Sequence, residues 1–356
     1  MGLRTRVAVL AVLPAVASGS ASAHVDYVTD GPGAAVDAVD YAASVLAVPA
    51  NALLFLGGGL AVVAVAAAYL RFRPAARDVA VFRETIADYR DLVPWMLRLS
   101  LGIPLVGAGF AGYLFSPVVA QPARILQVVL GFFLLFGLAT RAVAAAGLVT
   151  YLVAAAADPR LLLAMEYVGG FLGILLVGGG RPSADDVLGT VATAPGTVYG
   201  RVDPVHRVSE WVADVLDPFR AYAPSVVRVG LGATFVYLGL VEKLANPGRA
   251  LLVVEQYDLT ALVPVDPGVW VLGAGLVEIA VGVALVAGLF TRATALVAFV
   301  ILTTTLFGLP NDPVLPHVTL FGLSSAVLTM GAGPLSLDAV LAARTGTARQ
   351  RGVPGR

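Results

Sequence analysis

The chain has 356 residues, of which 58% are hydrophobic and 13% are charged, and its formal net charge is zero. A mean hydropathy of +0.88 is too high for a water-soluble globule of this length, so the composition indicates an integral membrane protein. The balanced charge gives no sign of nucleic-acid binding, and a sequence without cysteine excludes disulfides, iron–sulfur clusters and thiol chemistry.

The first residues have the pattern of a secretory signal. Two arginines precede an apolar run, and the small residues Ala-Ser-Ala end at position 23, so residues 1–23 are interpreted as a signal peptide. An uncleaved membrane anchor is the alternative, although the apolar run is short for a span. Residues 24–48 are then expected to form an extracytoplasmic segment.

Beyond this segment, nine apolar stretches are long enough to cross a bilayer as helices. The sequence therefore predicts an all-α, polytopic membrane protein. The spans are expected near 49–70, 95–114, 123–139, 142–157, 161–178, 225–243, 268–289, 293–309 and 315–333.

Eight of these spans are predicted to form two tandem copies of one unit. Three pairs of segments match in the same order, namely PWMLRLSLG (94–102) with PSVVRVGLG (224–232), GLATRA (137–142) with GLFTRA (288–293), and GGGRPSADDVL (178–188) with GAGPLSLDAVL (331–341). We therefore predict two four-helix bundles, at 95–188 and 224–341, preceded by one extra transmembrane helix at 49–70.

Basic residues are unevenly distributed between the loops. Beyond the signal, only Arg124, Arg160, Lys243 and Arg249 fall on the predicted outer side. This positive-inside pattern predicts a multi-pass cell membrane protein with its mature amino terminus outside and its carboxyl terminus in the cytoplasm. Because each copy has four helices, both copies enter from the cytoplasm and are expected to be parallel, related by a pseudo-twofold axis along the membrane normal.

The segments ahead of the two copies are amphipathic. Residues 71–94 and 189–223 carry apolar side chains at helical spacing with charged residues on the other face. We predict that these cytoplasmic linkers form helices along the inner leaflet, and docking onto a cytoplasmic partner is the alternative. Residues 342–356 are predicted to be a basic cytoplasmic tail.

The second copy carries spaced motifs across all four of its predicted helices: Arg228-Val-Gly-Leu-Gly232, Glu242-Lys243, Glu278, Gly288-Leu-Phe-Thr-Arg292 and Gly331-Ala-Gly-Pro-Leu-Ser-Leu-Asp338. With these motifs it resembles the DoxX family of small four-helix membrane proteins. The first copy is less similar, because Gly112-Tyr113 and Gln127 stand where the Glu-Lys pair and the second Glu would be. The resemblance implies a membrane redox setting, since family members include subunits linked to thiosulfate oxidation with quinone and to quinol oxidases.

Polar side chains of the second copy are predicted to share one level near the middle of the membrane: Thr234, Tyr237, Glu278, Thr303, Thr304, Ser324 and Ser325. An acid at this depth must be hydrogen-bonded or protonated, which would suit proton exchange beside a quinone headgroup. We predict Glu278 and Tyr237 as catalytic residues, with Thr234, Thr304, Ser324 and Ser325 in substrate binding. Alternatively, a neutral Glu278 bonds Tyr237 or Thr304 and only locks helix packing.

Charged residues near the helix ends have simpler interpretations. Glu242 and Lys243 are predicted substrate-binding residues at an outward-facing mouth, with capping by Glu242 and interface snorkelling by Lys243 as the alternative. Glu166 lies near the outer end of its span, where water is expected to reach it, so the first copy is interpreted as a scaffold. Arg228 and Arg292 have counterparts in the first copy and are expected to anchor the topology at lipid headgroups.

Few residues are available to hold a resident cofactor. With three histidines and no cysteine, the sequence offers no metal site and no ligand pair for a haem inside the bundle. His317 and Asp312 are expected to form a solvated loop pair, with a proton entry site as the alternative. The expected ligand is a quinone, and the expected partners are the bilayer and a redox subunit. A proton-coupled or small-solute transporter and a scaffold without turnover stay open.

Overall fold

The computed structural model describes residues 34–120, 124–202 and 204–351. The predicted signal peptide and the last five residues lie outside this part of the chain. The helices are α1 (Ala38–Ala47), α2 (Pro49–Phe72), α3 (Ala76–Ala87), η2 (Arg90–Leu92), α4 (Val93–Ala111), α5 (Arg124–Phe136), α6 (Thr140–Ala157), η3 (Pro159–Ala164), α7 (Glu166–Val177), α8 (Ala184–Thr193), α9 (Val198–Val202), α10 (Pro204–Leu216), η4 (Asp217–Tyr222), α11 (Ala223–Tyr237), η5 (Leu238–Leu244), α12 (Pro247–Gln256), α13 (Leu259–Leu262), α14 (Pro267–Ala287), α15 (Thr291–Gly308), α16 (Val314–Met330) and α17 (Leu337–Arg351).

Helices occupy every predicted span, and the all-α, polytopic membrane architecture is confirmed. Within the described residues, six helical segments are long and apolar enough to cross a bilayer. The helices α5, α7 and α16 are apolar but shorter, with 13, 12 and 17 residues. Both predicted linkers are largely helical, as α3 and as α8 to α10.

A short antiparallel hairpin, β1 (Tyr113–Leu114) and β2 (Ser116–Ala120), follows α4 and was not predicted. Gly112 ends α4 with a left-handed φ of 87°, which turns the chain back toward the bundle. The buried amide of Gln127 then holds the hairpin, because its Oε1 accepts from the Phe115 N–H at 3.0 Å and its Nε2 donates to the Tyr113 carbonyl at 3.1 Å.

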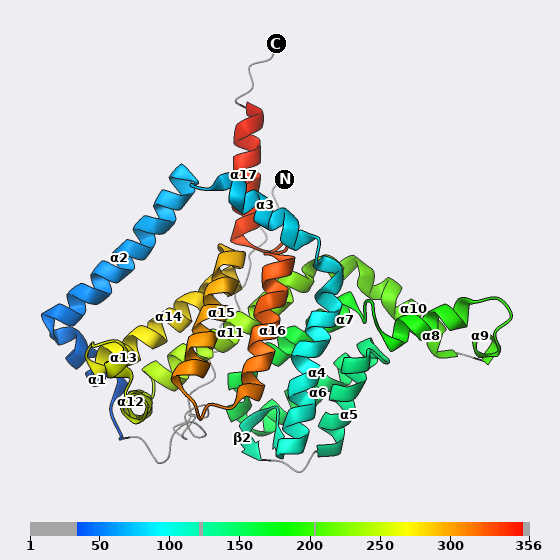
Figure 1. Cartoon of the computed structure of the whole chain (residues 1–356), viewed down its shortest axis with the longest axis horizontal. Coiled ribbons are helices and arrows are strands. Elements are labelled where there is room, and N and C mark those ends of the chain that lie inside the picture. Colours follow the sequence, from blue (N-terminus) through cyan, green and yellow to red (C-terminus); the bar gives the residue numbers. More distant parts are fainter. Residues whose placement is uncertain (1–33, 121–123, 203, 352–356) are drawn as a thin grey trace, which may run out of the picture.

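The two predicted copies interlock around a common centre. Within the copies, α4 packs on α5 and α11 packs on α14, while across the boundary α7 packs on α11 and α4 packs on α16. Small residues allow the α7–α11 contact, because a Cβ on Gly230 would lie 2.7 Å from the Gly169 Cα. A single hydrophobic core therefore runs through both copies. Figure 1 shows α4, α15 and α16 side by side, with α2 apart from them and α8 to α10 extending on the opposite side.

Arginines gather at one end of the bundle, which we call the arginine end. Here the side chains of Arg98, Arg141, Arg228 and Arg292 donate to backbone carbonyls at or just beyond the last turns of α7 and α16. The opposite end, which carries the β1–β2 hairpin, is called the hairpin end. These four arginine side chains are thus fixed by the protein itself, and Arg228 is only 1% exposed.

Two aspartates make matching contacts in the two predicted copies. Asp185 accepts from the N–H groups that begin α6, at 2.6 and 2.8 Å, and Asp338 does the same at the start of α15, at 2.8 Å for both bonds. Each carboxylate satisfies backbone donors that a helix start leaves unpaired. The duplication itself stays a prediction.

The glycine contact between α7 and α11 leads to a stability prediction. Gly230→Val is expected to lower the free energy of unfolding by about 1–3 kcal/mol, because the new side chain must push two backbones apart. Unfolding in mixed micelles, followed by circular dichroism, measures this loss. Gly58→Val is the control, since no atom lies within 4 Å of the Cβ position at Gly58. Equal effects of the two substitutions would contradict this packing account.

Candidate functional site

The centre of the candidate site is an ion pair between Lys243 and Glu278. The Lys243 Nζ lies 2.8 Å from Oε1 and 2.7 Å from Oε2 of Glu278, so it contacts both carboxylate oxygens. The two side chains are 25% and 12% exposed. Because a charge is costly to bury in an apolar bundle, this pairing compensates both residues at once.

A widened helical turn positions Lys243 for this contact. Residues Leu238–Leu244 form a π-helix, in which the Ala245 N–H reaches back to the Leu240 carbonyl. Such turns are rare in proteins overall, but those that occur are often found at functional sites. Glycines bring α14 close, because a Cβ on Gly239 would lie only 2.5 Å from the Gly275 carbonyl oxygen. The irregular turn and the close approach together bring the lysine within reach of Glu278.

This geometry corrects two expectations about the pair. The alternative for Glu278 was a neutral acid that bonds Tyr237 or Thr304, yet its partner is Lys243. Lys243 was alternatively expected to snorkel toward the membrane surface, yet its amine turns inward to the carboxylate. Residue depth predicted the acid correctly as a group that needs a partner, but the π-helical turn that supplies the partner has no clear signal in the sequence.

Glu166 and Thr234 form a second buried pair across the boundary between the two predicted copies. The Thr234 hydroxyl donates to Glu166 Oε2 at 2.8 Å, and its oxygen accepts from the Glu166 N–H at the same distance. The expectation that water reaches Glu166 is wrong, because the residue is only 4% exposed. The packing of α7 on α11 covers it. The first copy therefore contributes an acid to the interior, which its interpretation as a scaffold missed.

A third pair, Asp312 and His317, lies at the hairpin end. Asp312 Oδ2 is 3.4 Å from His317 Nε2, and the residues are only 4% and 3% exposed, so the expected solvated pair is wrong. Asp312 lies between α15 and α16. Burial raises the pKa of its carboxyl to about 6, against the opposing influence of His317 and of Lys243. The charge of Lys243 thus links this pair to Glu278.

The predicted polar layer does not form one pocket. Thr304 is exposed and donates to carbonyls of its own helix, and Ser325 donates to the Phe321 carbonyl one turn earlier. Ser324 is buried, and Glu242 is 1% exposed. Depth along a helix specifies the level of a side chain but leaves its direction open, so these residues share a level without sharing partners.

Tyr237 lines an apolar groove of about 510 Å³ on the side of α11. It supplies the single polar side chain among the lining residues, which are Met165, Ala233, Val236, Tyr237, Leu240, Val241, Val283, Val286 and Ala287. Tyr237 lies within electrostatic range of Glu242, and Tyr151 lies within range of both Tyr237 and Glu166. The groove is therefore almost entirely apolar, and Tyr237 is the one lining residue that carries a polar group.

The sequence interpretation missed Glu166 and the role of Gln127. The position of Glu166 within an apolar stretch indicated a residue of interest. The sequence could not predict that α7 and α11 cross at this point and bury it. Gln127 occupies the position that aligns with Glu278. Its amide bonds the backbone of the β1–β2 hairpin. Gln127 and Glu278 are therefore both polar, but their side chains have different roles.

The ion pair can be tested by a double-mutant cycle. Lys243→Gln and Glu278→Gln are each expected to destabilise the protein, because each leaves one charge without its partner. The double variant should lose less free energy of unfolding than the two single variants together, with a coupling energy of about 0.5–3 kcal/mol. Unfolding in mixed micelles measures all four states. The pair Asp158 and Arg160, with side chains 24% and 43% exposed, is the more solvated control, with a coupling of about 1 kcal/mol or less. Additive effects at 243 and 278 would contradict the pair.

The buried carboxyl of Asp312 predicts a pH dependence. Because its pKa is about 6 in the fold against an ordinary 3.8, the protonated form favours folding, and this contribution is lost as the pH rises from about 4 through 6. In Asp312→Asn, the midpoint of unfolding should therefore change less with pH over this range than it does in the wild type. Asp158 is a control with the opposite pH dependence, because the hydrogen bond from Arg160 lowers its pKa. Its contribution to stability is lost as the pH falls, so Asp158→Asn should reduce the loss of stability in acid. An unchanged pH profile in Asp312→Asn would refute the assignment.

Comparison with known proteins finds a family match over most of the second predicted copy. The DoxX family model matches residues 223–309, which include α11, α14, α15, the π-helical turn and the Lys243–Glu278 pair. No curated protein and no solved structure matches the chain. The resemblance predicted from the Glu-Lys and Glu motifs is thus supported over residues 223–309, and the chain is a multi-pass membrane protein that contains a DoxX-like domain.

Proposed function

We propose that this protein binds a lipid-soluble quinone and acts as the membrane subunit of a redox assembly. One observation carries the proposal, namely the apolar groove that Tyr237 helps to line. A quinone has an apolar ring and tail with carbonyl oxygens that accept hydrogen bonds. An apolar groove with one donor therefore matches its chemistry.

The surroundings of Tyr237 support proton exchange with such a ligand. Reduction of a quinone consumes protons together with electrons, so a binding site benefits from nearby acids. Glu242 is buried and lies within electrostatic range of Tyr237. Tyr151 lies within electrostatic range of both Tyr237 and Glu166. In this proposal Tyr237 donates to a quinone carbonyl, while Glu242 and Glu166 are the proton reservoir.

Glu278 has a different place in the proposal from the one that its depth indicated. Its carboxylate is held by Lys243, and its position is not among the residues that line the groove. The pair instead fixes the π-helical turn that carries Glu242 and follows Tyr237. Electrons enter or leave through a partner subunit, which supplies the redox cofactors of the assembly.

A proton-coupled transporter is the second candidate. It is favoured by the paired titratable groups toward the hairpin end, Lys243 with Glu278 and Asp312 with His317. Such pairs inside a membrane protein are typical of proton pathways. Uptake by proteoliposomes that is lost in Glu278→Gln distinguishes this function from quinone binding, and a scaffold predicts neither uptake nor bound quinone.

The quinone proposal predicts a measurable loss of affinity in Tyr237→Phe. Removal of one hydroxyl donor should weaken binding of short-chain ubiquinone or menaquinone analogues by about 2–10-fold, because a neutral hydrogen bond contributes about 0.5–1.5 kcal/mol. Val283→Trp should reduce binding further by filling the groove. Titration of the purified protein, followed by tryptophan fluorescence, gives the dissociation constants.

The control for this titration is Tyr222→Phe, an exposed tyrosine away from the groove. It should bind the analogues as the wild type does. If the wild type binds neither analogue, or if Tyr222→Phe and Tyr237→Phe weaken binding equally, the groove is not a quinone site.

A further inference from the structure

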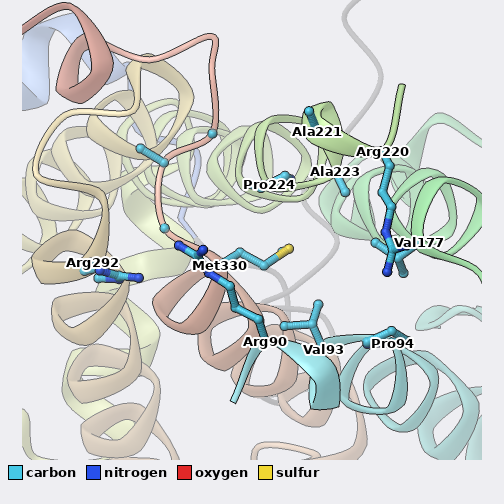
Figure 2. Close-up of a pocket in the computed structure, with 13 residues that line it drawn as sticks. Arg90, Val93, Pro94, Val177, Arg220, Ala221, Ala223, Pro224, Arg292 and Met330 are labelled. Carbon is cyan, nitrogen blue, oxygen red and sulfur yellow. The ribbon is translucent and has the colours of Figure 1, made fainter. Parts of the chain in front are cut away.

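A second pocket lies at the arginine end, where the two predicted copies meet. Its volume is about 560 Å³, and Figure 2 shows its lining residues: Arg90, Val93, Pro94, Val177, Arg220, Ala221, Ala223, Pro224, Arg292, Met330, Gly331, Ala332 and Gly333. Aligned positions face it from both copies, as with Pro94 and Pro224 or Val177 and Met330. The pocket therefore belongs to the boundary between the copies, away from the Tyr237 groove.

The charge of this pocket is positive and uncompensated. Three arginines line it and no acid does. In Figure 2 the guanidinium groups of Arg90 and Arg292 are directed toward the same part of the pocket, and Arg220 enters from the side of Val177. Arg90 and Arg83 both lie within electrostatic range of Arg292. Like charges held this closely repel one another, and a bound anion relieves the repulsion.

The three arginines differ in how the fold uses them. Arg292 donates to the carbonyls of Leu328 and Thr329 and is thereby held in place. Arg90 and Arg220 are exposed, and neither forms a side-chain hydrogen bond or ion pair with any other residue that the structure describes. Two guanidinium groups, on η2 and η4, are therefore available to a ligand beside a third that is fixed.

The chemistry of the lining identifies the ligand class. A guanidinium binds phosphate oxygens through two parallel hydrogen bonds, and basic pockets between transmembrane helices hold the headgroups of anionic lipids. We infer that the pocket formed by Arg90, Arg220 and Arg292 binds a phosphate ester of net negative charge, supplied either by the headgroup of an anionic phospholipid or by a soluble phosphate ester. Apolar neighbours such as Val93, Val177 and Met330 suit the start of the acyl chains of a phospholipid.

The test uses the full-length protein, delipidated in mild detergent and analysed by native mass spectrometry. Phosphatidylglycerol, phosphatidylcholine and glycerol 3-phosphate are the probes. Wild type should retain phosphatidylglycerol over phosphatidylcholine, and Arg90→Gln/Arg220→Gln should weaken this binding by about tenfold or more, because the double variant removes two charged hydrogen-bond donors. Competition by glycerol 3-phosphate identifies a soluble source, and retention of lipid without competition identifies the lipid.

Two further variants keep the test decisive. Arg77→Gln/Arg201→Gln removes the same charge from exposed positions outside the pocket and should leave binding unchanged. Arg90→Lys/Arg220→Lys keeps the charge without the paired donors and should give intermediate binding. Thermal unfolding checks that every variant is folded. The inference is overturned if wild type binds neither anionic probe, phosphatidylglycerol or glycerol 3-phosphate, better than zwitterionic phosphatidylcholine, or if the two double Gln variants lose binding equally.

Discussion

A charge inside this apolar bundle needs a partner supplied by the protein, and the arrangement of the helices follows from that requirement. Lys243 and Glu278 neutralise one another between η5 and α14, and Glu166 is satisfied by Thr234 between α7 and α11. Arg228 reaches four backbone carbonyls beyond its own helix. Because each partner lies on a different element, every such pair also fixes how two elements pack.

Close packing of small residues makes these pairs possible. Glycines bring α7 within backbone contact of α11, and Gly239 brings the π-helical turn against Gly275 of α14. Where the helices approach, Glu166 and Glu278 find their partners on a neighbouring element. Where they separate, the Tyr237 groove and the arginine pocket remain open. The same packing thus determines both which charges are satisfied internally and which polar groups are left to meet a ligand.

The sequence predicted the helices far better than it predicted their partners. Apolar length located each span, and the spaced motifs identified the DoxX domain. Depth also marked Glu278 as an acid that must be compensated. Three features were not predictable, because they depend on direction around a helix or on a change of helical pitch: the inward turn of Lys243, the burial of Glu166 and the hairpin held by Gln127. Residues that share a depth, such as Thr304 and Ser324, therefore separated in space.

The central claim is that Lys243 holds Glu278 as a carboxylate inside the bundle, and infrared difference spectroscopy tests it most directly. The spectrum of the wild type minus that of Glu278→Gln, recorded at neutral pH, should contain a carboxylate band and no protonated carboxyl band. In a Lys243→Met background, the same difference should gain the protonated carboxyl band, because the compensating charge is gone. A protonated Glu278 in the wild type, or a spectrum that does not respond to Lys243→Met, would contradict the account.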